Sequence, residues 1–184
     1  MELLGAAECD AVLAALDDLE WRPGRVATAS GADTAYSIRS CTIVELADRP
    51  LVERLQTWLL ELNRGLYNFD VLGFGAADPV AAMRYVEGDH FNWHIDNATA
   101  HTMSRKLSFS LQLTDPADYD GGDLELALYT SGLGAAGDSS AYRDQIRRRG
   151  EITVFPAFHL HRISPVTRGT RTALVGWVHG APFR

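Results

Sequence analysis

Cysteine is scarce in this sequence: 184 residues contain only Cys9 and Cys41, which form no CxxC pair. Two distant cysteines cannot supply the disulfide framework of a small secreted domain, so a hydrophobic core must stabilise the fold. No stretch reaches eighteen consecutive apolar residues, and we therefore expect no membrane-spanning helix. The N-terminus, MELLGAAECD, is acidic and unlike a secretory signal, which favours a cytoplasmic protein.

Basic residues are also in short supply. Seventeen Lys and Arg oppose 24 Asp and Glu, which gives a formal net charge of −7. A surface that attracts nucleic acid is usually basic, so we expect no nucleic-acid partner. Apolar residues make up 46% of the chain and charged residues 22%, as in ordinary globular domains, and we expect residues 1–184 to form a single domain.

Residues 1–70 are typical of a helical support region. Apolar positions at helical spacing predict amphipathic helices over residues 8–19 and 51–66, the second opened by Pro50. Between them, residues 21–35 are rich in Pro, Gly, Ser and Ala and predict a loop, whereas residues 37–46 alternate as a strand does.

After residue 70 the apolar pattern changes from a period of 3.6 to a period of two. Helices followed by about eight short strands predict a mainly β (α+β) fold, a jelly roll over residues 71–184 buttressed by the N-terminal helices. Residues 130–150 interrupt the strands and predict a mobile insertion at the mouth of the barrel. The expected strands are 71–74, 81–86, 91–95, 106–113, 123–129, 151–155, 159–164 and 172–179.

A histidine and a carboxylate two positions apart, His94 and Asp96, are candidate metal ligands. In an extended segment their side chains point to the same face. The segment FPAFHLHRISPV offers a third ligand, for which His161 and His159 are rival candidates. Two histidines and one carboxylate on one face of a metal are the ligands of non-haem Fe(II) oxygenases, which keep positions open for substrate chemistry.

Arg171 lies ten positions after His161, beyond the turn SPVTRG. Two strands joined by this turn would bring the arginine into the same cavity as the metal. The guanidinium group suits a carboxylate, which it binds through two parallel hydrogen bonds. Iron with an arginine nearby indicates a carboxylate-bearing co-substrate that also chelates the metal.

These residues fall into a pattern that resembles the 2-oxoglutarate/Fe(II) dioxygenases of the prolyl-4-hydroxylase-like group, and in particular the bacterial PKHD-type hydroxylases. The strand and turn pattern of RKLSFSLQLTDPADYDGGDLEL and of GEITVFPAFHLHRISPVTRGTRTALVGWVHG is similar too, so the resemblance covers residues 80–184 closely. The motif residues that carry it are Tyr85, Gly88, Phe91, His94, Asp96, His161 and Arg171.

The resemblance implies Fe(II), 2-oxoglutarate and O2 as cofactor and co-substrates. It implies iron ligation by His94, Asp96 and His161, since the H-R-hydrophobic-x-P-V pattern favours His161 over His159. It also implies that Arg171 and Tyr85 bind the distal carboxylate of 2-oxoglutarate. Related halogenases replace the ligand carboxylate by a small residue, so Asp96 favours hydroxylation.

The substrate-facing residues are less well defined. Phe91 stands where the prolyl-4-hydroxylase pattern commonly has tyrosine, which argues against a prolyl substrate. Asn92 and Asn97 flank the metal pair, and Arg105 opens the next strand, so these three with Phe91 are the candidate substrate contacts.

The function expected from the resemblance is hydroxylation of an unactivated C–H bond, with release of succinate and CO2. The short chain favours a small substrate such as an amino acid, a short peptide or a natural-product intermediate, with residues 21–35 and 130–150 as lids that determine specificity. The alternatives are a peptidyl (prolyl-type) hydroxylase acting on a protein and a cupin-like metalloenzyme that does not use 2-oxoglutarate. A jelly-roll binding module without enzymatic activity would need neither the metal ligands nor Arg171. Repair of alkylated nucleobases would favour a basic groove, which the acidic composition of this chain does not predict.

Overall fold

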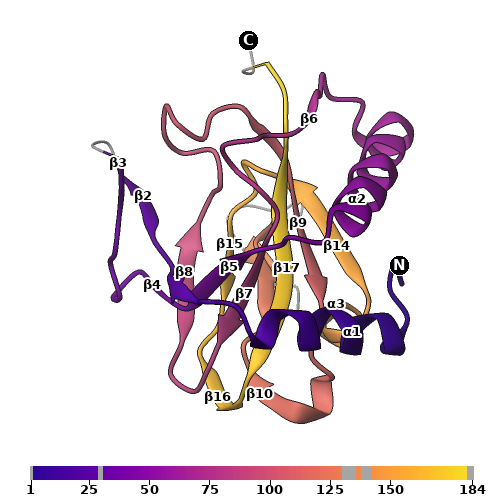
Figure 1. Cartoon of the computed structure of the whole chain (residues 1–184). Coiled ribbons are helices and arrows are strands. Elements are labelled where there is room, and N and C mark those ends of the chain that lie inside the picture. Colours follow the sequence, from indigo (N-terminus) through magenta and orange to yellow (C-terminus); the bar gives the residue numbers. More distant parts are fainter. Residues whose placement is uncertain (1, 29–30, 130–135, 138–141, 182–184) are drawn as a thin grey trace.

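Two β-sheets face each other, and helices cover one of them, in a computed structural model that describes residues 2–28, 31–129, 136–137 and 142–181. The jelly roll with N-terminal helices that the sequence predicts is confirmed. Figure 1 shows α2 and the β2–β3 hairpin at opposite edges of the molecule. The helices are α1 (Ala6–Asp17), α2 (Arg49–Leu62) and α3 (Arg143–Arg147), with a π-helical turn at Asn63–Tyr67 and a 3-10 turn at Pro116–Asp118.

The larger sheet has the strand order β1-β5-β7-β17-β9-β14, with β6 paired to the end of β17, and every pairing is antiparallel. β17 therefore lies in the centre, between β7 and β9. The strands are β1 (Arg22–Pro23), β5 (Thr42–Glu45), β6 (Gly73–Phe74), β7 (Ala81–Tyr85), β9 (Arg105–Gln112), β14 (Ile152–Pro156) and β17 (Arg171–His179).

The smaller sheet has the order β11-β15-β8-β4, also antiparallel, and the described residues form three further two-stranded sheets. These pairs are β2 with β3, β10 with β16 and β12 with β13. The bounds are β2 (Val26–Thr28), β3 (Gly31–Asp33), β4 (Arg39–Ser40), β8 (His90–His94), β10 (Tyr119–Gly121), β11 (Leu124–Leu126), β12 (Leu128–Tyr129), β13 (Ala136–Gly137), β15 (His161–Ile163) and β16 (Val166–Gly169).

α2 begins where the sequence predicts, for two local reasons. The Asp48 side chain accepts a hydrogen bond from the backbone N–H of Leu51 at 3.0 Å, which caps the helix, and Pro50 lies in the first turn, where its missing N–H costs nothing. Leu51, Leu55 and Leu59 are buried at a spacing of four residues. The last predicted turn differs, because the chain continues as a π-helix rather than an α-helix.

The larger sheet separates two hydrophobic clusters. The outer cluster joins α1 and α2 to outward side chains of β7, β9 and β17. The inner cluster lies between the sheets and includes Met83 and Tyr85 of β7, Phe155 of β14 and Ile163 of β15. β9 shows the division best: its apolar residues Leu107, Phe109 and Leu111 belong to the outer cluster, and the alternate polar residues Ser108, Ser110 and Gln112 are buried on the other face.

Several predicted boundaries need correction. Residues 21–35 were expected to be a loop, yet they contain β1 and both strands of the β2–β3 pair. The single strand expected over residues 37–46 is two, because β4 joins the smaller sheet and β5 the larger one. The turn expected before β17 contains β16, which pairs with β10.

About half of the insertion expected over residues 130–150 lies outside the described residues, namely 130–135 and 138–141. Its described C-terminal part contains the predicted helical turn, α3. Arg147 of α3 is buried, with its guanidinium stacked 4.1 Å from the Tyr119 ring centroid and paired with Asp123 at 2.6 Å. This part of the segment is therefore fastened to β10 and β11.

Candidate active site

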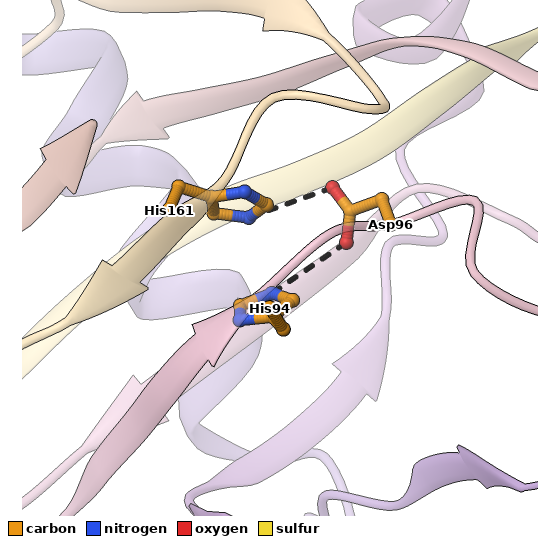
Figure 2. A group of neighbouring side chains, drawn as sticks. All are labelled: His94, Asp96 and His161. Atoms are coloured by element: carbon orange, nitrogen blue, oxygen red, sulfur yellow. Dashed lines mark ion pairs between the residues drawn. The ribbon is translucent and has the colours of Figure 1, made fainter. Parts of the chain in front are cut away.

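His94, Asp96 and His161 converge between the two sheets (Figure 2). His94 ends β8 and His161 begins β15, and these two residues are direct partners in the antiparallel pairing. Each histidine Nε2 lies 3.6 Å from a different oxygen of Asp96. The three ligand atoms all lie within 4.8 Å of one another. A separation of 3.6 Å is too long for a hydrogen bond and short enough for two ligands of one ion.

The hydrogen bonds of both imidazoles prepare them to bind a metal. Nδ1 of His94 donates to the carbonyl of Asn92 at 2.7 Å, and Nδ1 of His161 donates to the carbonyl of His159 at 2.8 Å. A carbonyl can only accept, so Nδ1 carries a proton in both rings, and the neutral form of each imidazole then has its lone pair on Nε2. Metal-binding histidines are usually held in this way. The residues present therefore fit a divalent metal.

Asp96 is held from its side chain and from its backbone. The Ser108 hydroxyl donates to Oδ2 at 2.5 Å, the Asp96 N–H donates to the carbonyl of Ala157, and Arg105 donates to the Asp96 carbonyl at 3.2 Å. Burial opposes ionisation of Asp96, but the adjacent histidines and the Ser108 hydroxyl outweigh it and hold the pKa of the carboxyl below its ordinary value. Asp96 is therefore an anion ready to coordinate a cation.

His161 is neutral at ordinary pH. It is 6% exposed, and burial lowers the pKa of its imidazole to about 4, with the nearby His94 contributing in the same direction and Asp96 opposing. A neutral imidazole is the form that binds a metal, so burial favours the ligand role.

A β-bulge in β8 determines which of its side chains reach the site. His161 pairs with His94 and Ile163 pairs with Phe91, so two residues of β8 lie opposite one residue of β15. Phe91 and His94 consequently share a face, and their rings stack with centroids 3.5 Å apart. Asn92 is exposed and donates from its side chain to the carbonyl of Ser37. The structure thus brings Phe91 to the histidines and gives Asn92 another partner.

Arg171 and Tyr85 lie opposite each other on β17 and β7, with the guanidinium 5.6 Å from the tyrosine ring centroid. Both are buried. Nη2 of Arg171 donates to the Ser110 hydroxyl at 3.3 Å, and within the described parts of the chain no carboxylate forms an ion pair with it. The Tyr85 hydroxyl donates to the sulfur of Met83 at 3.7 Å and also interacts with the Cys41 thiol, and burial raises its pKa.

The remaining candidates have other surroundings. Arg105 holds Asp78 with two hydrogen bonds of 2.7 and 2.9 Å and stacks on Trp177, so its guanidinium fastens the Asp96 segment instead of facing a ligand. Asn97 is partly buried beside Asp96. His159, the rival third ligand, turns away from the metal group, with Nε2 bonded to the carbonyl of Ala127 at 2.9 Å.

Three residues near the site carried too little signal in the sequence to be found. Ser108 and Ser110 alternate with apolar residues, a pattern that also suits a strand with one face in solvent. Arg39 lies in β4, far from the motif residues in sequence, and becomes their neighbour only because β4 pairs with β8. A polar residue at every second position of 106–113 was the one available signal for the serines.

A hollow of about 420 Å³ lies elsewhere, between α1 and the start of α2. Its lining is mainly apolar and contains no histidine or cysteine. It offers the carboxylates of Glu8 and Asp48 but no imidazole, so we place the chemistry at His94, Asp96 and His161.

A jelly roll that brings two histidines and one carboxylate together, each imidazole with a free Nε2, defines the class of non-haem Fe(II) oxygenases. The sequence profile of the 2OG-Fe(II) oxygenase superfamily matches residues 80–179. The chain belongs to this superfamily and is an Fe(II)- and 2-oxoglutarate-dependent hydroxylase that uses O2.

The relatives are PKHD-type hydroxylases. One from Synechococcus sp. is 31% identical over 189 residues, covering 97% of this chain and 76% of the relative. One from Idiomarina loihiensis is 32% identical over 99 residues, and that alignment covers 54% of this chain and 41% of the relative. The resemblance to this group that the sequence suggests is thereby confirmed.

Solved structures show the same fold. A prolyl-4-hydroxylase from Pseudomonas putida has a TM-score of 0.72 and 21% identity, covering 97% of this chain and 89% of its own. A prolyl hydroxylase from Trichoplax adhaerens has a TM-score of 0.71 and 18% identity, and the match covers 97% of this chain and 81% of the neighbour. It was solved in complex with a peptide fragment of the hypoxia inducible factor oxygen degradation domain. Among the described residues, no helix is both long and apolar enough to span a membrane.

Proposed function

We propose that His94, Asp96 and His161 are the iron ligands of this hydroxylase. The observation that carries the proposal is the pair of imidazole Nε2 atoms, both 3.6 Å from a carboxylate oxygen, in rings whose Nδ1 atoms are bonded to backbone carbonyls. When bound, Fe(II) would activate O2, coupling oxidation of 2-oxoglutarate to succinate and CO2 with hydroxylation of a C–H bond. The protein's part is to hold the ligands and to exclude water.

Arg171 is the proposed partner of the distal carboxylate of 2-oxoglutarate. A buried guanidinium without a carboxylate partner is costly, and binding of the co-substrate would supply the missing anion. Ser110 orients one nitrogen of the group. Tyr85 stands opposite, and its hydroxyl, whose partners among the described residues are the weakly accepting sulfurs of Met83 and Cys41, is available as a second donor to the same carboxylate.

A small substrate is the proposal that the surroundings of the metal group support best. Asp96 and His161 are buried, and the side chain of His94 is the most exposed of the three, at 16%. We infer from this exposure that the reacting part of the substrate enters from the His94 side and is narrow. A free amino acid, a short peptide and a natural-product intermediate all meet this condition. The peptide fragment bound by the Trichoplax neighbour supports the second candidate, a peptidyl hydroxylase that acts on a protein.

Residues 1–184 are proposed to act as a single domain. The outer and inner hydrophobic clusters both use side chains of β7 and β14, so the helical region and the roll share one central sheet. We also propose the segments 21–35 and 130–150 as the ones that determine specificity, as loops on a rigid scaffold often do.

The experiment is to reconstitute the purified chain with Fe(II) and measure succinate release from 2-oxoglutarate, alone and with a panel of amino acids, peptides and small proteins. The variant Arg171→Gln should lose this activity. The matched control is Arg168→Gln, three residues away, where the arginine side chain is 57% exposed and paired with Asp120. Normal turnover of Arg171→Gln would refute the co-substrate assignment. Oxygen consumption without 2-oxoglutarate would favour the cupin-like alternative.

A further inference from the structure

A second buried arginine lies beside the metal group. Arg39 of β4 is 7% exposed, and its guanidinium reaches into the inner cluster. Its three nitrogens donate to the sulfur of Cys41 at 3.1 Å, to the sulfur of Met83 at 3.1 Å and to the carbonyl of Arg25 at 2.8 Å. Among the described residues no carboxylate pairs with it.

These partners leave the charge of Arg39 poorly compensated. Thiol and thioether sulfurs are weak acceptors, and only the carbonyl of Arg25 is a strong one. A buried cation is expensive unless an anion or a full set of hydrogen bonds accompanies it. Burial works against the charge, but the interactions with Tyr85 and Cys41 and, to a smaller extent, with Asp96 outweigh it and raise the pKa of Arg39, so the group remains a cation.

The position of Arg39 links it to the reacting centre. β4 pairs with β8, and the partner of Arg39 across this pair is Phe91. The guanidinium carbon lies 4.8 Å from the centroid of the Phe91 ring, which in turn stacks on His94 at 3.5 Å. One aromatic ring therefore separates Arg39 from a proposed iron ligand.

Arg39 and Arg171 reach the inner cluster from different sheets. Arg171 belongs to β17 of the larger sheet and Arg39 to β4 of the smaller one. Between them lie Tyr85, whose ring Arg171 faces, and Met83, whose sulfur accepts from both Arg39 and Tyr85. The described part of the inner cluster thus has two separate buried arginines beside it, and 2-oxoglutarate has only one carboxylate left when the other chelates the metal.

We propose that Arg39 binds a carboxylate of the primary substrate, which makes the substrate a small carboxylic acid, for example a free amino acid. The proposal rests on the proposed function, in which Arg171 is occupied by 2-oxoglutarate. The planar guanidinium would hold the acid by charge-assisted hydrogen bonds at one end and leave its C–H bonds to reach past Phe91 to the metal.

The test compares acids with their amides. Succinate release by the iron-loaded enzyme is measured with each of the twenty L-amino acids, with a series of unbranched monocarboxylic acids, and with the carboxamide of every acid that stimulates. We expect stimulation by at least one acid and at least tenfold weaker stimulation by its amide. Equal stimulation by acid and amide, or no stimulation by any acid, would overturn the proposal.

The variants locate the effect at Arg39. Arg39→Gln should abolish stimulation by the acid while the substrate-independent succinate release and the KM for 2-oxoglutarate stay within twofold of the parent enzyme. Arg39→Lys retains the charge but cannot form two parallel hydrogen bonds, so it should retain partial stimulation. Arg168→Gln should behave as the parent enzyme. The substrate-independent release also reports folding of each variant, so an unfolded Arg39→Gln would be replaced by the lysine variant for the same comparison.

Two results would contradict this assignment without touching the proposed function. A rise of tenfold or more in the KM for 2-oxoglutarate in Arg39→Gln would mean that Arg39 serves the co-substrate. Full stimulation with a lowered melting temperature would mean that Arg39 only stabilises the fold. Failure of the proposed function looks different, because the parent enzyme itself would then release no succinate.

Discussion

His94 and His161 are direct cross-strand partners on β8 and β15, and their imidazole centroids lie 4.1 Å apart. This pairing joins two parts of the chain that are 67 residues apart in sequence, and the strand ladder fixes their separation. A site built on paired strands is more rigid than one built on loops. Asp96 lies beyond the end of β8 and lacks this support, which is why its hydrogen bonds matter.

Ser108 is expected to control metal affinity through Asp96. Its hydroxyl donates to Oδ2 of the carboxylate, and loss of such a partner typically weakens metal binding about 10–100-fold. We expect this loss for Ser108→Ala, measured by titration of the metal-free protein with Fe(II) under anaerobic conditions or with Co(II). Ser110→Ala is the matched control, since Ser110 is the next inward serine of β9 and contacts Arg171 instead. Equal metal affinities in the two variants would contradict the prediction.

Arg171 is expected to select 2-oxo acids that carry a second carboxylate. A hydrogen bond between charged groups contributes about 1.5–3 kcal/mol. Loss of the two parallel hydrogen bonds between the guanidinium and the carboxylate should therefore lower kcat/KM for 2-oxoglutarate about a hundredfold or more. In Arg171→Gln the preference for 2-oxoglutarate over 2-oxobutyrate, which lacks the distal carboxylate, should collapse. The measurement is kcat/KM for both co-substrates in the parent and variant enzymes. An unchanged ratio of the two kcat/KM values would show that another residue binds the distal carboxylate.

The sequence contained enough to predict the fold class and the clustering of His94, Asp96 and His161, because strand alternation and motif spacing are local patterns. Alternating apolar residues predict strands, and the interval between His94 and Asp96 suits a shared face. Strand alternation alone could not decide between His161 and His159, since residues two apart share a face in a strand. The structure separates them by their hydrogen bonds, because His159 is bonded to Ala127 and His161 has Nε2 directed at Asp96.

The bulge in β8 and the position of Arg39 depend on strand register, which cannot be predicted from the local sequence pattern. The period-two rule puts Phe91 out of phase with His94, yet the extra residue in β8 brings both to one face. Arg39 has no motif around it, and only the pairing of β4 with β8 makes it a neighbour of Phe91. Residues contributed by distant strands are therefore the part of the site that sequence patterns miss.

Leu55 is expected to report the contribution of α2 to the fold. Its side chain is fully buried in the outer cluster, so Leu55→Ala should lower the free energy of unfolding by about 2–5 kcal/mol through lost burial and the remaining cavity. Leu66→Ala is the control, because Leu66 is 67% exposed and its change should stay within about 0.5 kcal/mol. Urea unfolding followed by circular dichroism measures both. Equal midpoints would mean that α2 packs only loosely on the sheet.

The metal-free protein is expected to lose stability as the pH falls from about 6.5 to about 4. Burial lowers the pKa of His161 from the ordinary 6.5 to about 4, so in this range the unfolded chain takes up a proton that the folded protein does not. Protons bound more by the unfolded state mean that stability rises with pH and is lost on acidification, here by roughly 1–3 kcal/mol. Thermal melting in the presence of a chelator, at half-unit pH steps, measures the slope.

His161→Gln is the control for this slope, because glutamine does not titrate and the other histidines remain in both proteins. The difference in melting temperature between parent and variant should change steadily between pH 6.5 and 4 and level off above pH 7. Parallel curves over the whole range would show that His161 is protonated equally in the folded and unfolded states. In that case burial would not be what keeps this imidazole in its metal-binding form.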